Sequence, residues 1–285
     1  MIIGTNSSFF VTQNNSFVDP CNIVEELYKK NKNLNWPNYT YNFFSFILDF
    51  KAYSEYDFIK KTSENINLFN NNLNLINAEV SYSKFLELEE SIKFYDKKEY
   101  LKEYFDNNLI KNVYEINIKN KNIYRDIIIP SLSSLTVESK LFLDDFNCEI
   151  FVKLLDLFLA VPMSFIDNDH DQVIRKKFFQ CGDYSRYNSQ LSYYFLSNFW
   201  LKPENINIAK LIYEIISFCY SYLESEDYCK FYDTSRGYVD VFGYDWLELA
   251  TALNKSDLVK INKYLLFTYS FLPESIVKEI ENNIN

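Results

Sequence analysis

The sequence predicts a mainly α-helical protein, either an antiparallel helical bundle or an irregular α-solenoid of stacked helix pairs. Three observations support this fold class. Apolar residues recur at the helical period in many segments, most clearly in 205–223. The 285-residue chain holds only four glycines and six prolines, which are too few for a turn-dense β fold or a glycine-rich nucleotide-binding fold. Short connections between successive helical patterns favour antiparallel neighbours.

Residues 1–130 are predicted to form an N-terminal helical region. Residues 1–19 alternate loosely between apolar and polar and predict a short strand or an unattached arm. Pro20 suits the first turn of a helix. The asparagine cluster 70–72 is expected to break a helix. The helices predicted in this region cover 20–31, 39–75 and 78–105.

Residues 112–129 allow two interpretations. Tyr114, Ile116 and Ile118 alternate with polar residues, and a β-branched run follows a short polar stretch, so the two-residue period predicts a β-hairpin. A helix fits almost as well. Pro130 ends this stretch and marks the expected boundary between the two regions.

Residues 131–285 are predicted to form a C-terminal helical domain. The helix over 149–161 is apolar almost all round, which is typical of a helix surrounded by others. Asp245 and Glu248 have the spacing of a capping box, in which each side chain bonds the other's backbone amide. Ser256 is likewise expected to cap the helix that follows it. The helices predicted here cover 136–146, 149–161, 167–179, 190–200, 205–223, 245–253, 257–272 and 274–284.

Charge and cysteine content limit the possible partners and compartments. The formal net charge of −10 would repel phosphates, so it argues against nucleic acid and anionic membranes as partners. It fits either a basic protein partner or simple solubility. The most apolar run, 154–163, is too short to cross a bilayer. The N-terminus does not resemble a signal peptide. Five scattered cysteines fit free thiols in a reducing cytoplasm: Cys21, Cys148, Cys181, Cys219 and Cys229.

The residue content argues against catalysis, and we expect no enzymatic activity, cofactor or metal site. The single histidine, His170, limits zinc sites and Ser-His or Cys-His catalysis to arrangements that use it. An EF-hand loop starting at Asp167 would need glycine and glutamate where Gln172 and Phe178 stand. The sequence contains no glycine-rich phosphate loop. An enzyme that combines His170 with nearby carboxylates remains the third of three hypotheses.

The candidate binding site is an acidic, ring-rich segment that connects two predicted helices. Connections are usually polar, so a connection rich in aromatic rings indicates either a small satellite core or a binding face. Tyrosine rings supply rigid contact area, and carboxylates attract a basic partner. The residues predicted to bind the partner are Glu224, Glu226, Asp227, Tyr228, Asp233, Tyr238, Asp240 and Tyr244.

The last third of the chain resembles PoNi-type immunity proteins, which are all-helical bacterial antitoxins of polymorphic toxin systems. The similarity covers the residues from Gly237-Tyr238 to Ala250, the Asn254–Leu258 turn and the Tyr269–Pro273 patch. Glu248 matches the acidic residue of the family's helix, whereas Asp245 is inserted between the tyrosine and the tryptophan. The resemblance implies neutralisation of a cognate toxin by direct binding.

The first hypothesis is therefore an immunity protein that covers the active site of a basic toxin, expected to be a nuclease, with its acidic aromatic face. A nuclease attracts phosphates with a basic cleft, which carboxylates can occupy. The second hypothesis is a helical-repeat scaffold or regulatory binding module without enzymatic activity. A large apolar groove would favour that alternative. The sequence leaves the oligomeric state open.

Overall fold

The computed structural model describes residues 1–14, 16–32, 39–41, 45–81, 85–87, 110–114, 128–130, 133–167, 180–194, 196–225 and 245–284. The chain divides into two compact units. Unit 1 comprises Met1–Ile110, Lys119–Val137 and Leu196–Ala209, and unit 2 comprises Lys111–Ile118, Glu138–Phe195 and Lys210–Asn285. Both units contain strands and helices, and nine strands belong to one sheet. The fold is therefore α/β, and the prediction of a mainly α-helical bundle or solenoid is wrong.

Unit 1 is built around one long strand, β1 (Ile2–Gln13). β1 pairs antiparallel with β4 (Phe46–Ala52), from Ile3 opposite Ala52 to Phe9 opposite Phe46. Its other end pairs with β5 (Ala78–Ser81) and β2 (Ser16–Phe17), and β3 (Tyr39–Tyr41) extends the sheet beyond β4. Most of β1 is buried on both faces, so the strand has little apolar–polar alternation in its sequence.

The first half of the predicted helix 39–75 is a strand. In β4 the side chains of Phe46, Leu48 and Phe50 are buried, whereas Asp49 and Lys51 are exposed. Because Phe46 and Phe50 are four residues apart, their spacing fits both a helix and a strand, and the helical interpretation was wrong. The helix α2 (Glu55–Asn74) starts only after its N-cap residue, Ser54. It continues through the asparagine cluster 70–72, which was expected to break a helix.

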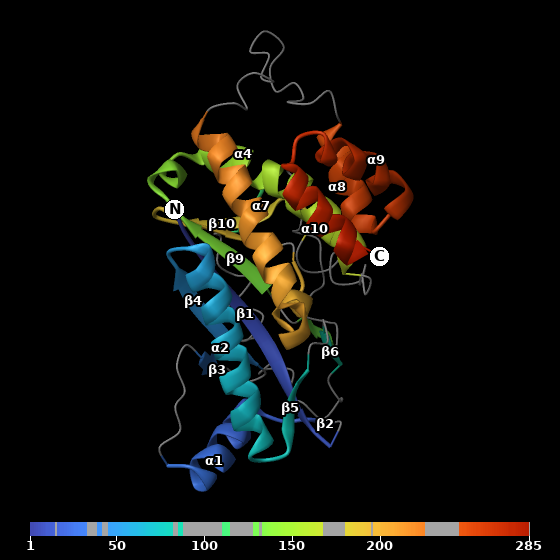
Figure 1. The fold of residues 1–285 in the computed structure, drawn as a ribbon. Coiled ribbons are helices and arrows are strands. Elements are labelled where there is room, and N and C mark those ends of the chain that lie inside the picture. The colour runs from blue at the N-terminus through green and yellow to red at the C-terminus, as the bar shows by residue number, and fades with distance from the viewer. Residues whose placement is uncertain are drawn as a thin grey trace. The chain divides into compact units, whose positions relative to one another are not determined.

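Helix α2 packs against β4 and β5 and closes the core of unit 1 (Figure 1). Its inward face carries Phe58 and Phe69, which are both buried. Phe69 stacks on Tyr39 with ring centroids 4.4 Å apart and meets Phe46 edge-on at 5.0 Å. Phe58 stacks on Trp200 at 6.0 Å. The remaining elements of unit 1 are α1 (Pro20–Lys30), β6 (Phe85–Glu87), β8 (Ile128–Pro130), β9 (Ser133–Glu138) and the 3-10 helices η4 (Asn198–Leu201) and η5 (Pro203–Asn205).

Two further predictions for the N-terminal region are corrected where the structure describes them. The predicted helix 78–105 begins as β5 and β6. The C-terminal end of the predicted hairpin 112–129 belongs to β8, which pairs with β6. The remaining residues of both segments lie outside the described part, apart from 112–114. The helix predicted over 20–31 is confirmed as α1, with Pro20 in its first turn.

The centre of unit 2 is a continuous helical segment made of α4 (Asp145–Leu155), the π-helix η3 (Asp156–Ala160) and α5 (Val161–Ile166). Its side chains are buried on nearly all sides from Ile150 to Ser164, which confirms the surrounded helix predicted over 149–161. Helix α7 (Ile206–Glu224) confirms the 205–223 prediction, and Phe218 packs edge-on against Phe158 of η3 at 5.2 Å.

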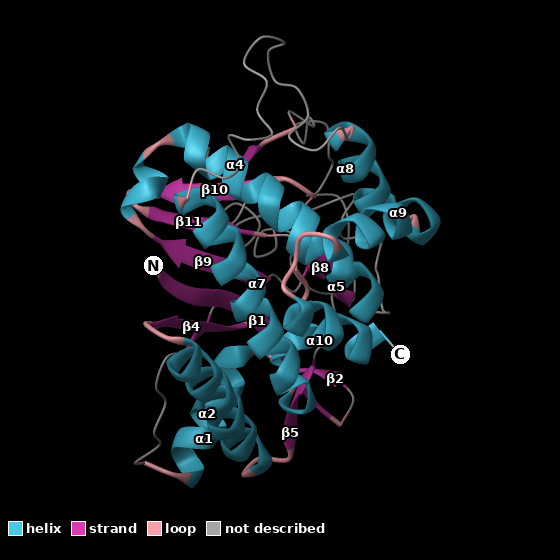
Figure 2. Cartoon of the chain, turned by 45° about the horizontal axis from the view of Figure 1, so that its top comes forward, coloured by secondary structure: helices cyan, strands magenta, loops and turns pink. Residues whose placement is uncertain are grey.

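Three C-terminal helices gather beside α5 in unit 2, as Figure 2 shows. They are α8 (Trp246–Lys255), α9 (Leu258–Tyr269) and α10 (Glu274–Ile284), as predicted. The expected cap at Ser256 is wrong, because Ser256 adopts a left-handed conformation (φ 52°) that ends α8, and Asp257 caps α9.

Two other predicted helices of the C-terminal region begin as strands. The segment 136–146 starts within β9 and continues as the 3-10 helix η2 (Lys140–Leu143). The segment 190–200 contains β11 (Gln190–Tyr193), which forms a hairpin with β10 (Asp183–Tyr187). Asn188 turns this hairpin with a positive φ of 53°. β7 (Ile110–Asn112) lies at the boundary of the two units, and the predicted helix 167–179 lies outside the described residues beyond Asp167.

Candidate functional site

The structure describes only the ends of the predicted partner-binding segment. Glu224 is exposed in the last turn of α7. Asp245 follows the segment and caps α8, with its side chain accepting hydrogen bonds from the amides of Leu247 and Glu248 at 2.9 and 3.0 Å. The other predicted partner-binding residues lie outside the described part of the chain: Glu226, Asp227, Tyr228, Asp233, Tyr238, Asp240 and Tyr244.

The predicted capping box at the start of α8 is half confirmed. Asp245 plays the expected role, whereas Glu248 points to α9 and accepts hydrogen bonds from Lys263 and from Tyr264, the latter at 3.1 Å. These contacts join α8 to α9 and hold the C-terminal end of the segment. Both ends of the segment are therefore attached to packed helices of unit 2.

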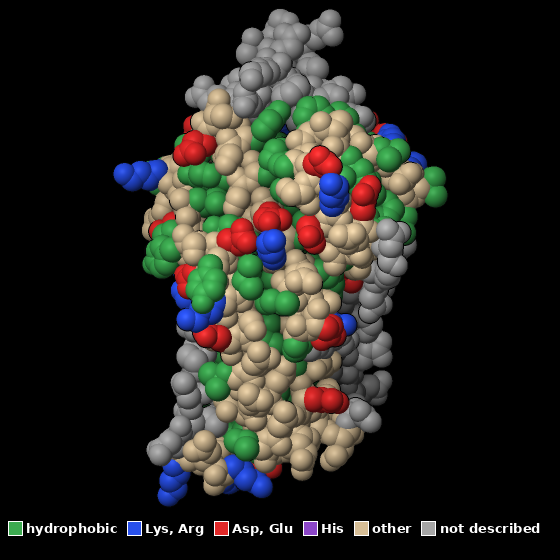
Figure 3. Space-filling model, in the orientation of Figure 1, with side chains coloured by type: hydrophobic (Ala, Val, Ile, Leu, Met, Phe, Trp, Pro, Cys, Tyr) green, Lys and Arg blue, Asp and Glu red, His purple; other side chains and the backbone are tan. Residues whose placement is uncertain are grey.

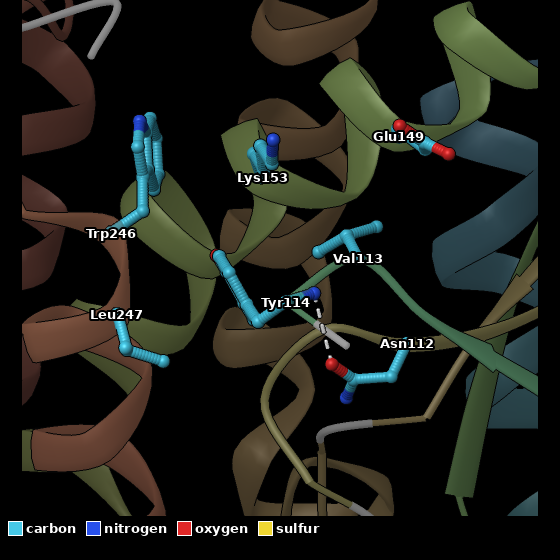
Figure 4. A pocket seen from close by; sticks show the side chains of 7 residues that line it. All are labelled: Asn112, Val113, Tyr114, Glu149, Lys153, Trp246 and Leu247. Carbon is cyan, nitrogen blue, oxygen red and sulfur yellow. Dashed lines mark hydrogen bonds between the residues drawn. The ribbon is translucent and has the colours of Figure 1, made fainter. Parts of the chain in front are cut away.

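A cavity of about 450 Å³ begins where the segment ends, at the first two residues of α8 (Figure 4). A volume of this size is typical of sites for small ligands. Helix α8 contributes two side chains and α4 contributes two. The last residue of β7 and the two residues that follow it contribute three. The cavity is lined by Asn112, Val113, Tyr114, Glu149, Lys153, Trp246 and Leu247.

Tyr114 is held at both of its ends. Its backbone amide donates to Asn112 Oδ1 at 2.9 Å, which is the dashed line in Figure 4, and its hydroxyl donates to Asp156 Oδ2 at 2.8 Å. Gly182 lies directly against the ring, because a Cβ on Gly182 would be only 2.6 Å from Tyr114 Cδ2. Gly182 also has a φ of +85°, which favours glycine. The ring is thus a preformed wall of the cavity.

Beneath Tyr114 lies a fully buried carboxylate, Asp156, at the start of the π-helix η3. Besides Tyr114, Asp156 accepts hydrogen bonds from the Tyr193 hydroxyl at 2.7 Å and from the Gly182 amide at 3.3 Å. Burial raises the pKa of Asp156 to about 6, while the tyrosine hydrogen bonds act in the opposite direction. The same burial raises the pKa of Tyr114 well above its usual range. π-helical turns often occur at functional sites.

A second buried carboxylate, Asp183, orders the loop that carries Gly182. Asp183 accepts hydrogen bonds from Asn112 Nδ2 and from the Gln180 amide, both at 2.6 Å. Asn112 also donates to the Cys181 carbonyl at 3.0 Å. Asn112 therefore links this loop to Tyr114, and the polar floor of the cavity is one connected network.

Glu149 and Lys153 place two opposite charges on the α4 side of the cavity. They are half-buried and one helical turn apart. Desolvation lowers the pKa of Lys153, whereas attraction to Glu149 and Asp156 acts against this shift. Figure 4 shows Lys153 between Trp246 and Glu149, with Val113 and Tyr114 below them. The cavity thus combines one cation and one anion with aromatic and aliphatic side chains.

Both oxygens of Asp156 accept hydrogen bonds from the protein, so this carboxylate serves to hold Tyr114 and Tyr193. Within the described ranges no group of three or more His, Cys, Asp or Glu side chains could hold a metal ion. His170, the base of the enzyme hypothesis, lies outside those ranges.

None of the residues that line this cavity was predicted as a site residue from the sequence. Two signals were available: Asp156 interrupts the most apolar run of the chain, and Gly182 is one of only four glycines. Neither signal identifies Tyr114, because its partner Asp156 is 42 residues away.

In comparisons with known proteins, no family model, no curated protein and no solved structure matches this chain. The resemblance to PoNi-type immunity proteins stays a prediction. None of the helices that the structure describes has the length and hydrophobicity needed to cross a membrane.

Proposed function

We propose that this protein is an immunity protein that neutralises a basic toxin, most simply a nuclease, by direct binding in the cytoplasm. The observation that carries the proposal is the composition of segment 224–244. It combines five carboxylates with six aromatic rings and only two basic residues, Lys230 and Arg236. Such a segment attracts a cationic surface and supplies rigid contact area.

The described surface supports this choice of segment. On the face drawn in Figure 3, the Asp and Glu side chains lie intermixed with Lys and Arg side chains. Among the described residues, ion pairs on a single helix include Lys60 with Glu64 and Lys278 with Glu274. A surface of paired charges attracts a partner weakly, so we assign the contact to the segment where carboxylates are in excess.

Co-expression with the product of the neighbouring gene tests the proposal. We expect the two proteins to co-purify as a stoichiometric complex and the toxin to lose its activity in that complex. The double variant Asp227→Lys, Asp233→Lys should weaken binding and protection, because it turns attraction into repulsion.

The matched control is Glu25→Lys, Glu64→Lys, which makes the same change in net charge at exposed positions of α1 and α2. This control should bind and protect as the wild type does. Failure to co-purify would contradict the immunity function. Full protection by the Asp227/Asp233 variant would contradict the assignment of the contact to this segment.

A further inference from the structure

The cavity beside α8 offers the complement of a small zwitterion. One wall, from α4, presents the Lys153 ammonium and the Glu149 carboxylate one helical turn apart. The side chains of Val113, Tyr114, Trp246 and Leu247 present apolar surface. A molecule that carries one positive and one negative group next to an apolar body would satisfy all three features.

The charge balance favours a zwitterion over a simple ion. A lone anion at Lys153 would be repelled by Glu149 and by the buried Asp156, which both attract the ammonium of Lys153. A lone cation at Glu149 would be repelled by Lys153. A zwitterion avoids both repulsions, because each of its charged groups faces the opposite charge.

The cavity is also preformed, so little conformational entropy is lost when a ligand binds. Tyr114 is held by Asn112 and Asp156, and Asn112 is held by Asp183. Trp246 stands at the first position of α8, whose N-cap Asp245 is fixed by two amide hydrogen bonds. The walls of the cavity therefore come from packed elements rather than from a chain that must first become ordered.

We propose that this cavity binds a free α-amino acid with an aromatic or large aliphatic side chain. The carboxylate of the ligand faces Lys153, its ammonium faces Glu149, and its side chain lies against Tyr114 and Trp246. Binding is non-covalent and reversible. This inference does not rest on the proposed toxin binding, and it can be tested on the isolated protein.

Isothermal titration calorimetry with three related probes tests the proposal: L-phenylalanine, 3-phenylpropionate, which lacks the ammonium group, and phenethylamine, which lacks the carboxylate. We expect L-phenylalanine to bind at least about tenfold more tightly than either other probe, since each of them lacks one of the two attractions that L-phenylalanine makes, to Lys153 or to Glu149. Trp246→Phe should remove the change in tryptophan fluorescence that accompanies binding.

Two variants identify the charged groups. Lys153→Met should remove the preference for L-phenylalanine over phenethylamine, and Glu149→Gln should remove its preference over 3-phenylpropionate. Lys278→Met, at an exposed ammonium of α10 in the same unit, is the matched control and should bind as the wild type does. Far-ultraviolet circular dichroism and the Tm establish that each variant is folded.

Tighter binding of 3-phenylpropionate than of L-phenylalanine would overturn the proposal in favour of an anion site. Absence of binding by all three probes to the folded wild-type protein would overturn it outright. Unchanged preferences in Lys153→Met and Glu149→Gln would show that L-phenylalanine binds at another place, which also contradicts the proposal.

Discussion

The buried polar networks of the two units are built from different chemical groups. In unit 1 the buried groups of β1 and β9 are neutral hydroxyls: Thr5 contacts Ser7 at 2.7 Å, Ser7 contacts Ser133 at 2.9 Å, and Trp200 donates to Ser133 at 3.3 Å. In unit 2 the buried acceptors around Gly182 include the carboxyl groups of Asp156 and Asp183.

This difference has a consequence for stability. A hydroxyl network keeps the same charge at all ordinary pH values, whereas a buried carboxyl group changes its charge within the accessible range. The polar network of unit 2 is therefore both pH-sensitive and directly connected to a cavity, while that of unit 1 is neither charged nor part of a described cavity. The following predictions test this contrast, beginning with the largest expected effect.

Gly182→Ala should destabilise unit 2 by about 2–5 kcal/mol, because it adds the cost of a left-handed conformation to that of overpacking against Tyr114. Urea unfolding followed by circular dichroism measures the change. Asn188→Ala is the matched control, since Asn188 has a similar φ of 53° but is exposed in a hairpin turn. If both variants lose the same free energy, Gly182 does not support the Tyr114 ring.

Asp156→Asn should remove about 3 kcal/mol of pH dependence from the free energy of unfolding. Burial raises the pKa of Asp156 from 3.8 to about 6, so the folded state binds the proton more tightly than the unfolded state does. The stabilisation is complete below pH 3.8 and is lost as the pH rises through 6. The asparagine variant has no such loss.

Unfolding of the wild type and of Asp156→Asn should be compared across this pH range. The difference between the two proteins isolates Asp156, because carboxylates with lowered pKa values, such as Asp57 beside Lys61, contribute the opposite trend to both. If the difference in the free energy of unfolding between the two proteins stays constant across this pH range, Asp156 does not change its charge there and the contrast between the units fails.

Tyr114→Phe should cost about 2 kcal/mol at pH 7, because Asp156 then loses one charge-assisted hydrogen bond. The cost should shrink at pH 4, where Asp156 is protonated. The pKa of Asp156, followed by NMR, should rise further, since the Tyr114 hydroxyl lowers it in the wild type. An equal cost at both pH values would mean that the hydrogen bond from Tyr114 to Asp156 does not depend on the charge of the carboxyl group.

Ser7→Ala in unit 1 should have the smallest effect, about 1 kcal/mol, which is typical of a neutral buried hydrogen bond. The loss should be the same at pH 5 and pH 8, as measured by urea unfolding. A loss that depends on pH would show that the hydroxyl network of unit 1 is coupled to a charged group, and the contrast between the units would fail.

The prediction from sequence succeeded where one local signal was sufficient. Helix α7 has a continuous apolar stripe from Ile208 to Cys219, and the cap of α8 is formed by Asp245 as its spacing predicts. The prediction failed where local signals were ambiguous. Phe46 and Phe50 are four residues apart and fit both a helix and a strand, so the alternating segment β4 was assigned to a helix. For residues 1–19 the loose alternation left a short strand and an unattached arm open, and the structure shows the strand β1.

Local patterns were enough to predict the clearest amphipathic helices and the N-cap at Asp245, and composition alone identifies the acidic segment that precedes it. Folding was needed to pair the long strand β1 with β4 and to bring Tyr114, Asp156 and Gly182 together below one cavity. The two groups differ in the sequence distance over which the interactions act. A cap or an apolar stripe depends on neighbours within a few residues, whereas strand pairing and a buried carboxyl group depend on partners that are distant in the chain and are brought together only by folding.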